Sequence, residues 1–279
     1  MVAGLLRHQD FLDQLASGAQ YGVFIDDTGS PGLRSSASFL HPDRKSWVGV
    51  VVSPWQMPEV LDQFPGALDE LAKHTGASEF HFADIYAGRG AFSGVDLQVR
   101  LALFEFMAHL FRGYRFPVFV QTLDPVTLSK VREQAGDELP QRLRTFNLTK
   151  PQDLALLFLL IWVKRYIQES RASDQVLARV FVDEGFKKAG IGLPIPSWET
   201  VFADGAVFFA SSSSIQPIQL ADFAAFSLNR TQLLRGEEQL NEHDKRFLEI
   251  MSPIVWNFQN IDKQVVALDD WASLWDRGS

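Results

Sequence analysis

The 279-residue sequence contains no cysteine. Disulfide bonds, thiolate metal centres and thiol nucleophiles are therefore excluded. A chain without disulfides suits a reducing compartment, and we expect a cytoplasmic location.

Long hydrophobic runs are missing as well. The most apolar stretch, Leu154 to Val163, is ten residues long, about half the length that a bilayer-spanning helix needs. Lys164 and Arg165 end this stretch. We therefore expect a core helix here and no membrane partner, and we expect no secretory signal at the N-terminus.

Basic residues are outnumbered by acidic ones, with 26 Lys and Arg against 34 Asp and Glu and a net charge of -8. Such a chain is no generic nucleic-acid binder, because cationic side chains supply most non-specific affinity for phosphates. The objection weakens if the acids surround bound cations, or if bases such as Arg142, Arg144 and Lys150 line one face. The net charge therefore counts against a nuclease without excluding nucleic acid as a partner.

The chain is rich in hydrophobic residues, at 46%, and it shows the patterns of an α/β protein. Short Val-rich and Phe-rich stretches predict strands, and apolar residues at spacings of three and four predict helices. The first two strands predict a hairpin, and the later alternation of strands with long helices favours a mixed sheet with flanking helices. The predicted strands are residues 21–26, 46–53, 114–123 and 176–183, and the predicted helices are residues 95–111, 153–170 and 217–234.

No repeat or long polar linker divides the sequence, so we expect a single domain over residues 1–279. Its core covers about residues 20–235. The more charged segment 124–150 is interpreted as an irregular insertion, and 240–279 as an extension packed on the core. The aromatic residues that favour this packing are Trp256, Phe258, Trp271 and Trp275.

The first predicted strand ends in two adjacent carboxylates, Asp26 and Asp27. Burial of a carboxylate costs several kcal/mol unless the group is neutralised, paired or bound to a cation. The simpler interpretation is a turn, because Asp and Gly both favour strand ends and Asp can cap the turn with its own side chain. Which of the two interpretations applies depends on whether other residues of the chain lie beside these carboxylates and compensate their charge.

Three more acids stand where an apolar stretch begins or ends. Glu79 lies in SEFHFADI, Asp183 follows RVFV, and Asp222 lies in IQLADFAAF. A surface cap or turn explains any one of them. Asp222 is the most informative, because Asp is a poor helix former that is rarely buried unpaired.

The stretches VFIDDTGSPG, EFHFADI, VFVDEG and SIQPIQLADFAAF resemble the successive motifs of the domain-of-unknown-function 3800 family, whose fold is ribonuclease H-like. The match spans roughly residues 20–235, and its most specific parts are IDDTG and QLAD. The family typically has Asp-Glu-Ser-Gly at the first of these, so Asp27 and Thr28 are conservative departures.

The resemblance implies a site made by carboxylates. Asp26 would end the first, central strand, Asp183 would end a neighbouring strand, and Asp222 would face them from a late helix, with Glu79 completing the set. A carboxylate cluster of this kind can hold two divalent cations about 3.5 to 4 Å apart that clamp a phosphodiester. Carboxylate oxygens are ligands for Mg²⁺ or Mn²⁺.

His81 stands two residues after Glu79. On a strand this spacing puts both side chains on one face, with Phe80 and Phe82 on the other. His81 is either a structural histidine or a catalytic one that shuttles protons, contacts a substrate phosphate or orients Glu79.

These observations predict a Mg²⁺- or Mn²⁺-dependent nuclease or related phosphoryl-transfer enzyme acting on RNA or DNA. Its catalytic residues are Asp26, Glu79, His81, Asp183 and Asp222, and all of these except His81 are metal ligands. One alternative is a non-catalytic ribonuclease H-like binding or regulatory module, with a protein partner in a defence or mobile-element system. Another is a metal-free hydrolase that uses two carboxylates as acid and nucleophile or base.

Overall fold

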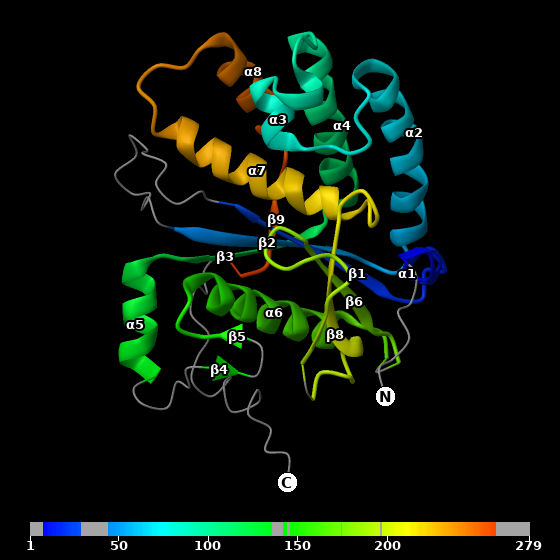
Figure 1. The fold of residues 1–279 in the computed structure, drawn as a ribbon, viewed down its shortest axis with the longest axis vertical. Coiled ribbons are helices and arrows are strands. Elements are labelled where there is room, and N and C mark those ends of the chain that lie inside the picture. The colour runs from blue at the N-terminus through cyan, green and yellow to red at the C-terminus, as the bar shows by residue number, and fades with distance from the viewer. Residues whose placement is uncertain are drawn as a thin grey trace.

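The structure is a computed structural model that describes residues 8–28, 44–135, 142–143, 146–173, 175–195 and 197–260. Helices cover both faces of one mixed sheet (Figure 1). The sheet has seven strands in the order β7-β8-β6-β1-β2-β3-β9. The α/β mixed sheet with flanking helices that the sequence predicts is therefore confirmed.

The first three strands form an antiparallel meander, and two later strands extend it in parallel. β1 pairs antiparallel with β2, and β2 pairs antiparallel with β3. On its other side β1 pairs parallel with β6, which pairs parallel with β8. The main strands are β1 (Tyr21–Thr28), β2 (Lys45–Val52), β3 (Pro117–Leu123), β6 (Ala178–Asp183) and β8 (Phe202–Ala210), and the short edge strands are β7 (Gly192–Pro194) and β9 (Asn257–Phe258).

The helices form a layer on each face of the sheet (Figure 1). One layer holds α2 (Met57–Thr75), α3 (Phe82–Ala87), α4 (Leu97–Tyr114), α7 (Ile218–Arg235) and α8 (Glu242–Met251). The other holds α6 (Pro151–Ser170), with α5 (Pro125–Ala135) and the hairpin of β4 (Arg142–Leu143) and β5 (Phe146–Asn147) beside it. The remaining helices are α1 (His8–Ala16) and the single 3₁₀ turn η1 (Gly90–Phe92).

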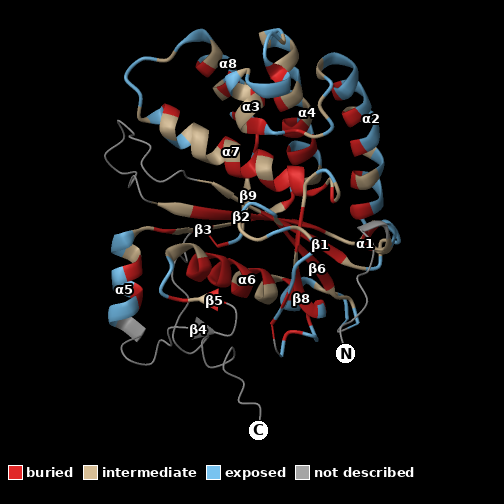
Figure 2. Cartoon of the chain, viewed as in Figure 1, coloured by how far each residue is buried: buried red, intermediate tan, exposed pale blue. Residues whose placement is uncertain are grey.

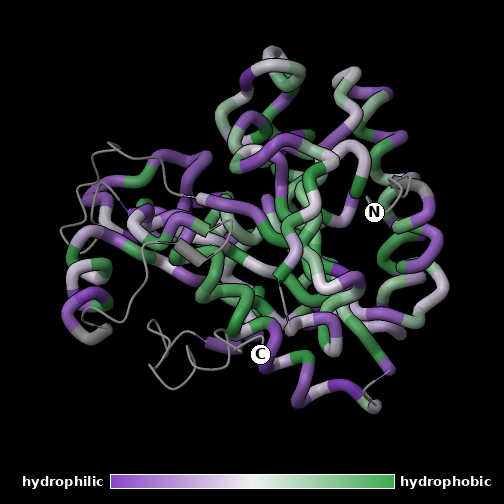
Figure 3. The backbone as a smooth tube through the Cα atoms, turned by 60° about the horizontal axis from the view of Figure 1, so that its bottom comes forward, coloured by the Kyte–Doolittle hydropathy of each residue, from purple (hydrophilic) through white to green (hydrophobic). Residues whose placement is uncertain are grey.

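Successive side chains of a strand point to opposite faces of the sheet, so each layer has its own core. In β1, Phe24 packs into the core beneath α7, and Val23 and Ile25 pack into the core beneath α6. Figure 2 shows the buried residues along the sheet and the inner faces of α6 and α7. Figure 3 shows that the most hydrophobic stretches run through the interior.

The apolar run from Leu154 to Val163 lies in α6 and is buried almost throughout. It is therefore the core helix that its length and flanking charges predict. Among the described helices, none is long and apolar enough to cross a membrane.

Two predictions about the organisation of the chain need correction. Segment 124–150 is not merely irregular, because α5 and the β4–β5 hairpin occupy much of its described part. Strand β8 was not expected, and its sequence explains why. Asp204 and Gly205 both have positive φ, 59° and 56°, so a turn-like pair interrupts the strand pattern near an irregularity in the pairing of β6 with β8.

The C-terminal segment adds an element that the sequence pattern does not reveal. β9 pairs parallel with β3 at the sheet edge. Trp256 and Phe258 stack on one another with ring centroids 6.2 Å apart and pack against the core beneath α7. Trp271 and Trp275 lie outside the described residues.

Candidate active site

Asp26 and Asp183 occupy matching positions on adjacent parallel strands. The last residue pair between β1 and β6 joins Ile25 with Val182, and each aspartate is the next residue of its strand. The carboxyl ends of parallel strands meet at one edge of a sheet, where open α/β sheets bind ligands. The two carboxylates therefore lie together at the place where such a fold usually carries its site.

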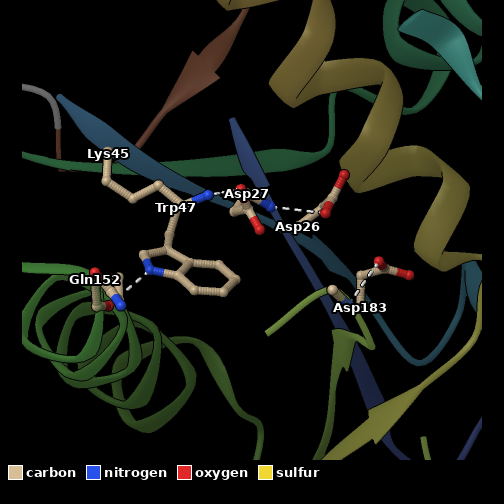
Figure 4. A network of polar contacts seen from close by, with 7 residues as sticks. Asp26, Asp27, Lys45, Trp47, Gln152 and Asp183 are labelled. Carbon is tan, nitrogen blue, oxygen red and sulfur yellow. Dashed lines mark hydrogen bonds and ion pairs between the residues drawn. The ribbon is translucent and has the colours of Figure 1, made fainter. Parts of the chain in front are cut away.

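The alternation of side chains assigns each aspartate to a face. Phe24 and Phe181 pack on the side of α7, so Asp26 and Asp183, two residues later, face the same side. Asp27 follows the opposite alternation and forms an ion pair with Lys45. Figure 4 shows Asp27 beside Lys45, and the hydrogen bond by which the Asp27 backbone N–H donates to Asp26 Oδ1.

Asp222 lies in the second turn of α7, the helix that covers this face of the sheet. Its Oδ2 accepts a hydrogen bond from the backbone N–H of Phe82, at 3.2 Å. The buried Gln219, one turn earlier, accepts from the N–H of Phe80 at 2.6 Å and donates to the carbonyl of Ser212 at 3.2 Å. These bonds fix α7 against the segment that carries the predicted Glu79 and His81.

Glu79 and His81 do not lie on a strand, so the alternation of side chains considered for them does not apply. Residues 79–81 are irregular, and α3 begins at Phe82 with His81 at its N-cap position. The backbone N–H groups of Phe80 and Phe82 donate to side chains of α7, not to a neighbouring strand. The two phenylalanines are nevertheless buried while His81 is exposed, so only the predicted sidedness is right.

Glu79 and His81 therefore stand in different relations to the strand-end carboxylates. Glu79 accepts a hydrogen bond from Ser212 Oγ at 2.5 Å and is not among the residues that line the cleft between these elements. His81 does line it, and its Nδ1 lies 3.0 Å from Asp84 Oδ2.

The cleft has a volume of about 610 Å³. Asp26, Asp27, Asp183 and Asp222 all contribute to its lining, so three of the four predicted metal ligands share it. Its other polar or charged lining residues are Thr28, Lys45, His81, Tyr86, Arg89, Ser212, Asn229 and Arg230.

The electrostatics of the cleft disfavour three ionised aspartates. Burial raises the pKa of Asp26 well above its ordinary value, and repulsion from neighbouring carboxylates, Asp222 foremost, raises it further. Burial raises the pKa of Asp222 to about 7, although His81 and the Phe82 N–H act in the opposite direction. Burial also raises the pKa of Asp183. Cleft carboxyls with raised pKa values are typical of catalytic or metal-binding sites.

The donor set has the chemistry of a hard-cation site. Carboxylate oxygens are the ligands that Mg²⁺ and Mn²⁺ prefer. Among the residues that the structure describes, however, no group of three or more acidic or histidine side chains is placed to hold a metal ion. The residue types therefore fit such an ion, and coordination by three of them would require side-chain rotations.

Sequence reasoning did not identify three residues that the structure brings to this site. Asp84 pairs with both His81 and Arg89. Ser212 holds Glu79. Arg230 lines the cleft and stands eight residues after Asp222 on α7. This spacing keeps both residues on one face of a helix, and it is the sequence feature from which Arg230 could have been predicted as part of the site.

Comparisons with protein-family models, with curated proteins and with solved structures found no match to this chain. The function must therefore be inferred from the site.

Proposed function

We propose that the protein is a Mg²⁺- or Mn²⁺-dependent nuclease, or a related phosphoryl-transfer enzyme acting on nucleic acid. The observation that carries the proposal is the meeting of Asp26 and Asp183, at neighbouring parallel strand ends, with Asp222 in one cleft. Three carboxylates that repel one another gain most from a divalent cation between them.

The strand order supports the ribonuclease H-like part of the proposal. An antiparallel meander of β1, β2 and β3 is joined through β1 to the parallel strands β6 and β8. A ribonuclease H-like sheet has this arrangement, with its first strand in the centre. Asp26 then lies on the central strand, as the family resemblance implies, although the strand continues for two residues beyond it, to Thr28.

The residues have distinct proposed roles. Asp26, Asp183 and Asp222 would hold the metal, and Glu79, whose Oε2 accepts a hydrogen bond from Ser212 Oγ, would have to turn into the cleft to serve as the fourth ligand. When bound, such ions supply activation of a water molecule and stabilisation of the leaving oxygen of a phosphodiester. Nδ1 of His81 lies 3.0 Å from Asp84 Oδ2, and the proposed role of Nε2 is to accept or relay a proton.

One observation favours a second candidate, the metal-free hydrolase. A carboxyl whose pKa is about 7, as at Asp222, is suited to general acid catalysis near neutral pH. In that case Asp222 would act as the acid and Asp26 or Asp183 as nucleophile or base.

The test is hydrolysis of single-stranded and double-stranded RNA, DNA and hybrid substrates with Mg²⁺, with Mn²⁺ and with EDTA. We expect cleavage with either metal, none with EDTA, and loss of cleavage in Asp183→Asn. Asp69→Asn, which removes an exposed carboxylate on α2, is the matched control and should cleave normally. Cleavage that survives chelation would select the metal-free hydrolase, and metal binding without turnover of any substrate would select the non-catalytic module.

A further inference from the structure

We propose that Arg230 forms a subsite for a phosphate group of the substrate strand, a few nucleotides away from the bond that is cleaved. The inference rests on the proposed function, because it places the strand along the same cleft. It gives the cleft a direction: the carboxylates lie near one end of α7, and the phosphate-binding arginine lies farther along the same helix.

The spacing on α7 sets the distance between the two parts. Asp222, Phe226 and Arg230 follow at intervals of four residues and all line the cleft. Eight residues of α-helix rise about 12 Å. One strand of a duplex advances about 3.4 Å per nucleotide, so Arg230 lies roughly three to four nucleotides from Asp222 along a bound strand.

The guanidinium of Arg230 is held in place before any ligand arrives. Its Nη2 donates to Asp244 Oδ1 at 3.0 Å, and its Cζ lies 4.5 Å from the centroid of the Tyr86 ring. Tyr86 donates its hydroxyl to the same Asp244 oxygen, and it also lines the cleft. An arginine fixed by stacking and one ion pair loses little further side-chain entropy when it binds a phosphate.

The protein does not use the full hydrogen-bonding capacity of this side chain. A guanidinium has five N–H donors, and Nε of Arg230 is shielded from solvent without a hydrogen-bond partner among the described residues. The side chain is nonetheless 31% exposed and lines the cleft. Nε itself is shielded, so a phosphate would bind the part of the guanidinium that is exposed at the cleft, where its several oxygens can accept from the Nη groups.

The cleft is also where cations gather on an acidic chain. Lys45, Arg89 and Arg230 all line it, although the whole sequence has a net charge of -8. Lys45 and Arg89 are each paired with an aspartate. Arg230 differs because its guanidinium stacks at 4.5 Å over Tyr86, which lines the same cleft, whereas Lys45 Nζ lies 6.0 Å from the ring of Trp47, which does not line it. We therefore assign the subsite to Arg230.

The experiment measures binding and hydrolysis with two probes. Fluorescence anisotropy with EDTA gives the affinity for a labelled single-stranded DNA or RNA of about a dozen nucleotides. Hydrolysis of bis(4-nitrophenyl) phosphate with Mn²⁺ reports the carboxylate centre alone, because this small diester has no second phosphate to reach Arg230. The variants are Arg230→Gln, Arg230→Lys and, as a charge-matched control, Arg246→Gln, which replaces an exposed arginine paired with Glu249.

We expect Arg230→Gln to weaken oligonucleotide binding about tenfold or more, and to lower the slope of log affinity against log salt by about 0.7 to 0.9. Arg230→Lys should keep most of the salt slope while losing affinity, because it keeps the charge without the planar fork. Arg246→Gln should bind like the wild type. Hydrolysis of the small diester should fall much less in Arg230→Gln than oligonucleotide affinity does.

Unchanged affinity and salt slope in a folded Arg230→Gln would overturn the subsite, as would equal weakening in Arg246→Gln. If Arg230→Gln does not fold, an unchanged affinity in Arg230→Lys would overturn it. Failure of the proposed function looks different, since the wild type would then hydrolyse neither the small diester nor nucleic acid, whatever Arg230 contributes to binding.

Discussion

Asp26 and Asp183 each follow one member of the Ile25–Val182 pair that joins β1 to β6. This register places the two carboxylates side by side at the carboxyl ends of parallel strands, on the face that α7 covers. Their proximity follows from backbone pairing and not from an attraction between them, because both are acids. Either a proton or a cation must therefore compensate their charge.

The first prediction concerns the pH dependence of stability without metal. Asp222 has a pKa of about 7 in the folded protein against an ordinary value of 3.8, so folding tightens its hold on a proton. Its contribution to the free energy of unfolding is fully present below 3.8 and is lost as pH rises through about 7. Chemical unfolding in EDTA should show a smaller decline over this range in Asp222→Asn than in the wild type. Equal declines in both would show that Asp222 titrates normally.

The second prediction concerns the contact that joins α7 to the segment before α3. Gln219 is fully buried and accepts from the Phe80 N–H. Gln219→Ala leaves that buried donor unsatisfied, which costs about 1 to 3 kcal/mol in the free energy of unfolding. Gln232→Ala, on the exposed side of the same helix, should change stability by less than about 0.5 kcal/mol. Similar urea midpoints for the two variants would contradict the assignment.

The third prediction separates a catalytic His81 from a structural one. His81→Ala should slow turnover by about 10² to 10⁴, the range for a positioned acid or base, while metal affinity and thermal unfolding stay close to those of the wild type. His109→Ala, which changes an exposed histidine on α4, is the control. Loss of stability and of metal binding in step with the rate would return His81 to a structural role.

Much of the central fold was predictable because its strands and helices have strong periodic patterns. The four expected strands and three expected helices all appear, with ends that differ by a few residues. β8 was missed because the Asp204–Gly205 pair looks like a turn. β9 was missed because a two-residue strand is too short to leave a pattern.

The site was only partly predictable, for a physical reason. Asp26, Asp183 and Asp222 could be placed because they end or begin strongly patterned elements, whose arrangement then brings them into one cleft. The conformation of the segment that carries Glu79 and His81 could not be predicted. It is fixed by side chains of α7, distant in sequence, which accept hydrogen bonds from the backbone N–H groups of Phe80 and Phe82. Local sequence contains no signal for such a contact.

The central claim is that the aspartates at the strand ends bind a divalent cation, and thermal unfolding with EDTA and with Mg²⁺ tests it most directly. Without metal, Asp26→Asn and Asp183→Asn should be at least as stable as the wild type, because each removes a repelling charge. The wild type should gain about 2.7 kcal/mol when free Mg²⁺ is a hundredfold above its dissociation constant, and neither variant should gain. The contrary result is a pair of variants that are destabilised by about 0.5 to 2 kcal/mol in EDTA, as after the loss of a capping carboxylate, and that still respond to Mg²⁺ like the wild type.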